Sequence, residues 1–327
     1  MSIPYGLLRA YLRQRAHGDA EAMHTLGLRY ATEVQRSPQL LALLEWWYRA
    51  QHNPTPRRVA GIYFPNPIGF AAGLDKNGVM PVLLQALGFG FGEIGTVLPN
   101  KQDGNARPRF FEVPSGFINR FGFNSVGCAR VQRALQELAP RIRIPLGGSL
   151  GVMKGTAETL SPTAAANDCA TAASMLWDNV QFLIANVSSP NTPGLRTLLQ
   201  KQYIRVFVSE LSTALDMKAE RTGTARRPLF VKVSADLSEH ELVTVLEAAV
   251  ECGAQGLVIG NTTTTRPLML ISEHRDEQGG LSGSHLYPLM LQLLCWARRV
   301  DRSFPIVAAG GINPYNVQEV FDAGAGI

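Results

Sequence analysis

The sequence predicts an α/β protein built on a (β/α)8 TIM-type barrel, preceded by a helical extension at the N-terminus. After residue 58, short apolar runs alternate with helical stretches, which is the pattern of a parallel sheet covered by helices. Polar residues and glycines follow the apolar runs at their C-terminal ends, where barrels of this type hold their reacting groups. Before residue 58 only helical periodicity is present.

The bulk composition is that of an ordinary globular chain, with 327 residues, 46% hydrophobic and 17% charged. The four cysteines have no CxxC spacing, which argues against a metal or iron–sulfur site and against a disulfide framework. No apolar run is long enough for a membrane-spanning helix, and the N-terminus lacks the features of a secretory signal. No basic stripe accompanies a nucleic-acid-binding motif, so we expect no nucleic-acid partner.

The N-terminal extension carries nearly all of the net charge of +5. Residues 1–58 contain eight arginines against four acidic residues, a balance of +4. Helical periodicity covers residues 5–51, and its last stretch, residues 38–51, contains the pair Trp46 and Trp47. Two interpretations stay open: a helical hairpin packed on the main domain, or amphipathic helices lying in a bilayer interface with arginines on the wet side.

The elements of the barrel follow in order along the chain. The predicted strands are residues 68–72, 91–95, 145–149, 182–187, 229–233, 256–260 and 305–309, with helices over 161–177, 238–252 and 286–300. The last residues, DAGAGI (322–327), repeat the phrase that leads into the earlier strands, and the sequence stops there. We therefore expect residues 58–327 to form a barrel without its eighth strand and helix, and residues 1–57 to form a separate helical, membrane-associating segment.

The residues at the strand ends suggest an anionic ligand with a planar ring. Glycines there permit close backbone approach to a phosphate: Gly73, Gly283, Gly310 and Gly311. Four asparagines each offer a donor and an acceptor, which suits an amide ring such as a pyrimidine: Asn119, Asn186, Asn191 and Asn261. Lys76 could balance a carboxylate, and Lys232, inside a strand, would be a costly charge unless it met an anion.

Six motifs make the resemblance specific: AAGLDKNG, EIGTVLPNKQDGNARPR, INRFGFNS, NVSSPNTPGLR, GNTTTTRP and GGLSG, in this order. Together they resemble the dihydroorotate dehydrogenases of the quinone-dependent, membrane-associated class (class 2), over nearly the whole chain. DAEAMH (19–24) is similar to the start of the helix that forms the quinone tunnel of that family.

The resemblance implies an enzyme of de novo pyrimidine biosynthesis that oxidises (S)-dihydroorotate to orotate. In the family FMN accepts a hydride from C6 while a base removes the C5 proton, and a quinone, ubiquinone or menaquinone, reoxidises the flavin. It also implies peripheral attachment through the N-terminal helices, to the cytoplasmic face of a bacterial inner membrane or to the mitochondrial inner membrane.

The resemblance also implies a role for individual residues. Ser189 matches the catalytic base, with Thr192 and a water near Phe123 as the proton relay; a cysteine takes the place of the serine in the related soluble enzymes. Substrate positions are matched by Lys76, Asn119, Arg120, Phe121, Gly122, Phe123, Asn186, Asn191, Asn261 and Thr262. Flavin positions are matched by Ala72, Gly73, Leu74, Asp75, Lys76, Thr96, Ser149, Asn186, Lys232, Gly260, Gly283 and Gly311.

Three positions depart from the family pattern. Ser149 stands where the family usually has Asn, Gly260 where it has Thr or Ser, and Glu112 where it has an Arg that faces the quinone. These departures and the missing strand favour an alternative, a degenerate or truncated relative that no longer catalyses and binds FMN poorly. A second alternative is another FMN-dependent barrel oxidoreductase acting on a different ring.

Overall fold

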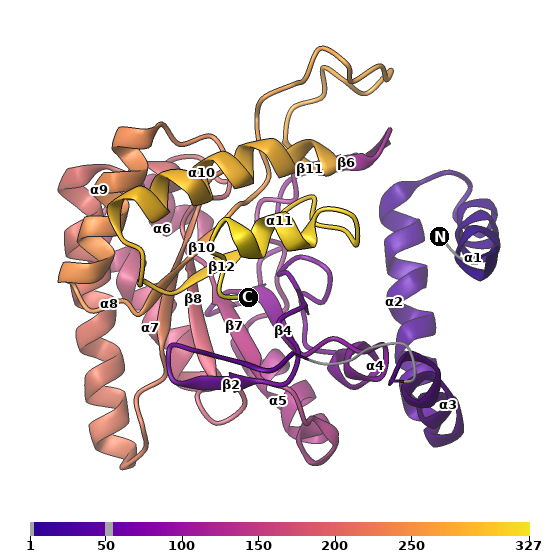
Figure 1. Cartoon of the computed structure of the whole chain (residues 1–327), viewed down its shortest axis with the longest axis horizontal. Coiled ribbons are helices and arrows are strands. Elements are labelled where there is room, and N and C mark those ends of the chain that lie inside the picture. The colour runs from indigo at the N-terminus through magenta and orange to yellow at the C-terminus, as the bar shows by residue number, and fades with distance from the viewer. Residues whose placement is uncertain (1–2, 50–54) are drawn as a thin grey trace.

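The computed structural model describes residues 3–49 and 55–327, and its centre is a curled parallel sheet of seven strands (Figure 1). The strands, in sheet order, are β12 (Ile306–Ala308), β10 (Gly256–Ile259), β9 (Leu229–Val233), β8 (Phe182–Asn186), β7 (Leu146–Leu150), β4 (Phe91–Val97) and β3 (Gly69–Phe70). All six pairings are parallel. The seven predicted strands are confirmed, but within the described residues the sheet is a half-barrel, because β3 and β12 do not pair with each other.

Helices cover the outside of the sheet, as the sequence predicts. They are α4 (Pro81–Ala86), α5 (Cys128–Leu138), α6 (Lys154–Glu158), α7 (Pro162–Leu176), α8 (Lys201–Thr222), α9 (Glu239–Glu251), α10 (Tyr287–Val300) and α11 (Val317–Asp322), with short 3-10 turns η1 (Ala139–Arg141), η2 (Leu195–Leu199) and η3 (Ser284–Leu286). Local sequence sets their starts: Ser161 caps α7, and Ser238 with Glu241 forms a capping box at α9. The helices predicted over 161–177, 238–252 and 286–300 are confirmed.

Aromatic rings fill the inside of the half-barrel at the amino ends of the strands. The Phe64 ring lies edge-on to Phe91 and Phe182, and Phe182 lies edge-on to Phe230. Phe64 comes from a hairpin of β1 (Arg57–Val59) and β2 (Ile62–Phe64) that covers this end. The interior is therefore a packed core, and an open site is possible only at the carboxyl ends.

The last residues pair with the free edge of β12. Gly326 N donates to Ile306 O at 2.8 Å, and Ala308 N donates to Ile327 O at 2.9 Å. Alternation of this kind is the hydrogen-bond pattern of a parallel strand. Residues 322–327 thus lead into strand-like pairing, as their likeness to the segments that precede earlier strands predicts.

A second sheet of three antiparallel strands stands above the carboxyl ends of the barrel strands. It consists of β5 (Phe110–Val113), β6 (Gly116–Asn119) and β11 (Gly280–Gly283), with β6 in the centre. No local sequence pattern predicts this sheet. It carries Asn119 to the site and forms one wall of the cavity described below.

Three N-terminal helices lie beside the barrel: α1 (Ile3–Arg15), α2 (Ala20–Arg36) and α3 (Pro38–Arg49) (Figure 1). The predicted helical character of 5–51 is confirmed as far as residue 49; residues 50–54, which include the last two residues of that stretch, lie outside the described residues. Helix α2 attaches the group, because Glu21 pairs with Arg109 at 2.9 Å and the buried Gln35 side chain accepts from the backbone of Val82 and Leu83 at the start of α4.

Large apolar side chains of α1 and α3 nevertheless remain exposed, among them Leu7, Leu43, Trp46 and Trp47. In the described part of the chain, none of the helices combines the length and the apolar character that crossing a bilayer requires. Helix α2 thus packs on the main domain, as the first interpretation predicts, whereas contact of the uncovered apolar surface with a bilayer stays a prediction.

Candidate active site

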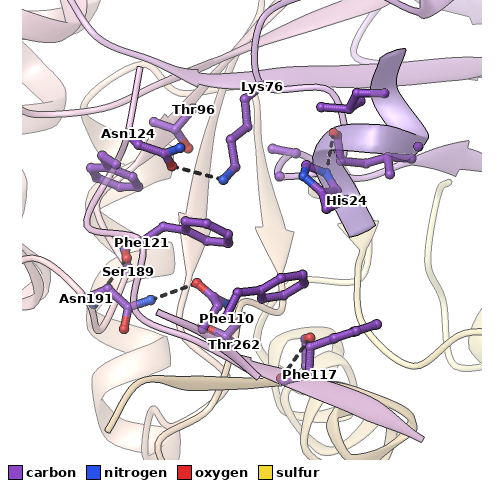
Figure 2. A pocket seen from close by; sticks show the side chains of 18 of the residues that line it. His24, Lys76, Thr96, Phe110, Phe117, Phe121, Asn124, Ser189, Asn191 and Thr262 are labelled. Atoms are coloured by element: carbon purple, nitrogen blue, oxygen red, sulfur yellow. Dashed lines mark hydrogen bonds between the residues drawn. The ribbon is translucent and has the colours of Figure 1, made fainter. Parts of the chain in front are cut away.

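A cavity of about 610 Å³ opens between the N-terminal helices, the small sheet and the carboxyl ends of the barrel strands (Figure 2). Of the predicted site residues, the following line it: Ala72, Gly73, Leu74, Lys76, Thr96, Asn119, Phe121, Gly122, Phe123, Asn186, Ser189, Asn191, Asn261 and Thr262. They come from segments spread over almost two hundred residues of sequence, because parallel strands bring their carboxyl ends to the same edge.

The asparagines form a connected network at the polar end. Asn261 Nδ2 donates to Asn186 Oδ1 at 3.1 Å, and Asn186 Nδ2 donates to Thr96 Oγ1 at 2.7 Å. On the other wall, Asn191 Nδ2 donates to Asn119 Oδ1 at 3.2 Å. These bonds fix the amide orientations before any ligand arrives, so the remaining donors and acceptors are presented in set positions.

Ser189 follows β8 and is 7% exposed, at the wall of the cavity. Its Oγ accepts from the backbone N–H of Asn191 at 3.3 Å, which holds the oxygen in place. The nearby Thr192 is buried, and its Oγ1 has no hydrogen-bond partner within the described residues. A buried hydroxyl without a partner is costly, and a proton relay or a water is a physical reason for one.

Lys76 projects into the cavity toward Asn124, above the ring of Phe121 (Figure 2). Its Nζ donates to Asn124 Oδ1 at 2.9 Å and lies 3.3 Å from the centre of the Phe121 ring. Burial, followed by the charge of Arg109, lowers the pKa of Lys76 to about 8, and the Glu21 carboxylate opposes this only in part. An anion bound here would restore the charged ammonium.

Lys232 meets an anion from the protein itself. Its Nζ lies 3.1 Å from Glu93 Oε2, and both side chains are almost completely buried. Glu93 Oε2 also accepts from the backbone N–H of Ala72 at 3.2 Å. The pair joins β9 and β4, which are separated in the sheet by two strands, so it spans the inside of the curl.

Other predicted residues lie outside the cavity. Asp75 is buried and accepts from the N–H groups of Val79 and Met80, so it orders the turn before α4. The Arg120 guanidinium pairs with Glu277 at 2.6 Å and lies over the Phe111 ring, on the opposite face of the small sheet from Asn119. These contacts hold the guanidinium away from the space where a ligand would bind.

Ser149 and three glycines complete the surroundings. Ser149 Oγ lies 3.3 Å from Thr96 Oγ1 and so extends the amide network by one buried hydroxyl. A β-carbon on Gly260 would lie 1.8 Å from Ala309 O, and one on Gly283 would lie 2.1 Å from Ser115 O. At Gly311 it would lie 2.8 Å from Tyr287 N. Close backbone packing therefore explains the glycine at position 260, where the family has Thr or Ser.

The far end of the cavity is apolar and is formed by the N-terminal helices and the small sheet. Leu8 and Leu12 of α1 and Met23 of α2 line it together with the ring of Phe110, which stacks on Phe117 with 4.8 Å between centroids. At the rim Arg9 of α1 forms an ion pair with Glu112 of β5. The departure at Glu112 is thus balanced by an arginine from another element.

Sequence reasoning missed Glu93, Asn105, Asn124 and the Phe110–Phe117 pair. Asn105 Nδ2 donates to the carbonyls of Arg120 and Asn191 and so joins two walls of the cavity. The sequence does carry a signal for Glu93, because it is the one charged residue in the apolar strand FGEIGTV. A lone charge within a buried strand needs a partner, and Lys232 was the other such case.

The residues present fit the FMN that the sequence resemblance implies. Gly73 has φ +108°, and a β-carbon there would meet nothing within 4 Å, so its backbone borders open space beside Thr96 and Asn186. Lys232 places a cation next to this space, and two left-handed glycines, Gly310 and Gly311, follow β12. Polar and charged side chains thus border the space for a flavin ring, and the glycines after β12 leave their backbone free for a phosphate.

Comparison with known proteins gives a consistent result. A sequence model of the family described as dihydroorotate dehydrogenase matches residues 56–327. The chain is 36% identical over 302 residues to the dihydroorotate dehydrogenase (quinone) of Xanthomonas oryzae pv. oryzae, with 90% of this chain and 82% of the relative covered. It is 36% identical over 330 residues to the enzyme of that name from Chloroflexus aurantiacus, covering 99% and 89%.

Solved structures agree. A crystal structure of DHODH from Eimeria tenella in complex with ferulenol superposes with a TM-score of 0.75 at 30% identity, covering 89% of this chain and 84% of that chain. The ligand-free form from the same organism gives the same TM-score at 32% identity.

The buried pair generates a prediction for stability. Lys232→Met leaves Glu93 charged and unpaired, and we expect a loss of about 3–5 kcal/mol in the free energy of unfolding. The double variant Lys232→Met/Glu93→Gln removes both charges but keeps an acceptor for Ala72 N–H, and should recover most of that loss. Urea unfolding followed by circular dichroism measures both. Equal losses in the single and double variants would contradict the assignment.

Proposed function

The chain belongs to the dihydroorotate dehydrogenase family, and from this premise we propose how its cavity carries out the oxidation of dihydroorotate to orotate. It is a quinone-dependent dihydroorotate dehydrogenase of pyrimidine biosynthesis. One observation supports our assignment of roles most directly. A single cavity has Lys76, Ser189 and the asparagines at one end, and apolar side chains of α1 and α2 at the other.

The polar end suits the substrate, a ring of amide groups that carries a carboxylate. Asn119, Asn191 and Asn261 supply donors and acceptors for the amides, and the Lys76 ammonium pairs with the carboxylate. Thr262 and the backbone at Gly122 border the same space. Because Arg120 is paired with Glu277, we assign its substrate contact to the backbone, not to the guanidinium.

Ser189 is the general base. Its Oγ accepts the proton from C5 of dihydroorotate, and the neighbouring Thr192 hydroxyl, which has no hydrogen-bond partner among the described residues, passes the proton on. A serine is a weak base at its ordinary pKa, so the relay and the fixed position given by Asn191 N–H are both required. Phe123, with its backbone at φ +54°, lines the same cavity, where the ring borders the space for the relay water.

FMN, when bound, supplies the two-electron acceptor between substrate and quinone. Lys232, Thr96 and Asn186 would hold its ring, and the Ala72–Gly73 backbone would lie against it. Gly283 and Gly311 would lie at its phosphate, with no side chain to block the backbone N–H groups. The Lys232 charge would stabilise negative charge on the ring.

The apolar end suits the quinone, ubiquinone or menaquinone. Residues 1–57 form the segment that receives it, with α1 and α2 as walls and the Arg9–Glu112 pair at the rim. Residues 58–327 form the FMN-binding domain. The exposed Trp46, Trp47 and Leu43 of α3 make the membrane contact, at the cytoplasmic face of a bacterial inner membrane or at the mitochondrial inner membrane.

Ser189→Ala tests the base. We expect kcat for orotate formation to fall roughly 10²- to 10⁴-fold, the usual contribution of a general base. Ser189→Cys keeps an acidic group of similar size and should regain part of the activity with an optimum at lower pH, because a thiol ionises more readily. Orotate absorbance measures both. Activity of Ser189→Ala within a few-fold of the parent would refute the assignment.

Lys76 gives a pH dependence for ligand binding. Its pKa of about 8 in the free protein means that the ammonium predominates below pH 8 and is progressively lost above it. Binding of the orotate anion then takes up a proton, so the dissociation constant should rise above pH 8, by up to about tenfold per pH unit. Calorimetry between about pH 7 and 9 measures this. His24, whose pKa is lowered by burial, titrates below this range.

Lys76→Met serves as the control for that experiment. It should bind orotate weakly at every pH, with a flat profile over the same range, because the titrating cation is absent. A flat profile in the parent protein would show that Lys76 does not meet the carboxylate.

Membrane attachment is tested on α3. Replacing Trp46 and Trp47 by Ser removes two large, mainly exposed apolar side chains from this helix. We expect much weaker co-flotation with liposomes and an unchanged rate with a short-chain, water-soluble quinone. The matched control is Met217→Ser on α8, an apolar residue that is similarly exposed but lies on the barrel. Equal flotation of both variants would contradict the proposal.

A further inference from the structure

We propose that Arg196 and Asp236 form a positioning clamp that holds the Ser189 loop in register with the loop after β10. The inference rests on Ser189 as the base. Neither residue lines the cavity, and neither was singled out for a function on sequence grounds. Both act through the backbone next to residues that do line it, so they are positioning residues and not catalytic ones.

Arg196 contacts three separate loops with one guanidinium. Its Nε donates to the carbonyl of Ser188 at 3.2 Å, directly before Ser189. Its Nη2 donates to the carbonyl of Thr262 at 3.4 Å, and its Nη1 lies 2.9 Å from Asp236 Oδ2. Ser188 follows β8, Asp236 follows β9 and Thr262 follows β10, three adjacent strands of the sheet.

Asp236 fixes the other half of the clamp. Oδ2 also accepts from Thr264 N at 3.0 Å and from Thr264 Oγ1 at 3.1 Å, and Oδ1 accepts from the Thr263 hydroxyl. Burial raises the pKa of Asp236, but the hydrogen bonds from Thr263 and Thr264 and the charge of Arg196 outweigh it and lower the pKa below its ordinary value. The carboxylate is therefore ionised, and both of its oxygens accept hydrogen bonds.

A second link runs parallel to the first on the cavity side. Asn261 Nδ2 donates to Ser188 Oγ at 2.8 Å, so the two loops are joined through the side chain of Ser188 as well as through its carbonyl. Arg196 lies just after Gly194, in the 3-10 turn η2, and its side chain reaches back across the loop to Ser188. This contact closes residues 188–196 into a ring, and the position of Ser189 then depends on Arg196.

Arginine is required because three acceptors lie in different directions. The planar guanidinium offers donors in a fixed fork, whereas a lysine ammonium is a point charge that reaches fewer of them. Arg196→Lys therefore keeps the charge but loosens at least one loop. Since a misplacement of about 1 Å in a reacting group can cost roughly 10²-fold in rate, a small shift of Ser189 is enough to be measured.

The test compares Arg196→Lys and Asp236→Asn with a matched control, Arg226→Lys. Arg226 also makes an ion pair and several hydrogen bonds, with Asp216, Ser212 and the Gly253 carbonyl, but lies before β9 at the amino ends of the strands. For both clamp variants we expect kcat to fall roughly 10- to 100-fold with a smaller change in the KM for dihydroorotate. Arg226→Lys should keep the parent kcat.

Two further readouts separate positioning from general structural damage. Amide hydrogen exchange should quicken in residues 187–194 and 260–265 of the clamp variants and stay unchanged in α7 and α8. The kinetic isotope effect with substrate deuterated at C5 should increase, because proton removal becomes slower.

Three outcomes decide the matter. Parent-like kcat and loop exchange in Arg196→Lys and Asp236→Asn would overturn the clamp. Slower turnover with faster exchange throughout the barrel, shared by Arg226→Lys, would also overturn it. If Ser189→Ala retains full activity while the clamp variants quicken loop exchange, the clamp stands as a loop restraint and the base assignment alone fails.

Discussion

The structure depends on burying Lys232 and Glu93 together inside the curl of the sheet. Each charge alone would be expensive to desolvate, and their strands, β9 and β4, are not neighbours. The two can meet at 3.1 Å only if the sheet curves until opposite strands face each other. The Ala72 N–H completes the shell of Glu93 and thereby attaches the turn after β3 to the same point. The curvature of the sheet, the Lys232–Glu93 pair and the shape of the site thus depend on one another.

The curvature of the sheet also preorganises the polar end of the cavity. Once the sheet is curved, the carboxyl ends of β4, β8 and β10 converge, and Thr96, Asn186 and Asn261 come within hydrogen-bond distance of each other. Amides that are bonded to one another cannot reorient freely, so little reorganisation remains when a substrate binds. The small sheet then adds Asn119, which accepts from Asn191 of the loop after β8.

The sequence is sufficient to predict the elements and most of the site lining, but not the long-range pairings. Apolar runs and caps are local, so the seven strands and the helices α7, α9 and α10 could be predicted. The small sheet joins residues 116–119 to 280–283, and no local pattern announces a pairing over that distance. Matching motifs placed Arg120 at the substrate, but a motif fixes backbone position and not side-chain direction, and Glu277, far away in sequence, turns the guanidinium outward. The opposite charges of Arg9 and Glu112 could likewise not be paired before α1 was placed.

The unpaired edges of the half-barrel lie beside the glycines of the proposed phosphate site but away from Ser189. The seam lies between β3 and β12, where a second hollow of about 270 Å³ is lined by Phe70, Val307, Gly310, Gly311 and Ile327. Ser189 and Asn191 follow β8 and Asn261 follows β10, strands that are paired on both edges, so their geometry does not require closure of the seam. Gly310 and Gly311 stand at the seam itself. Under the proposed roles, freedom of this sheet edge would weaken the hold on the phosphate before it disturbed proton transfer, because Ser189 follows β8, which is paired on both edges.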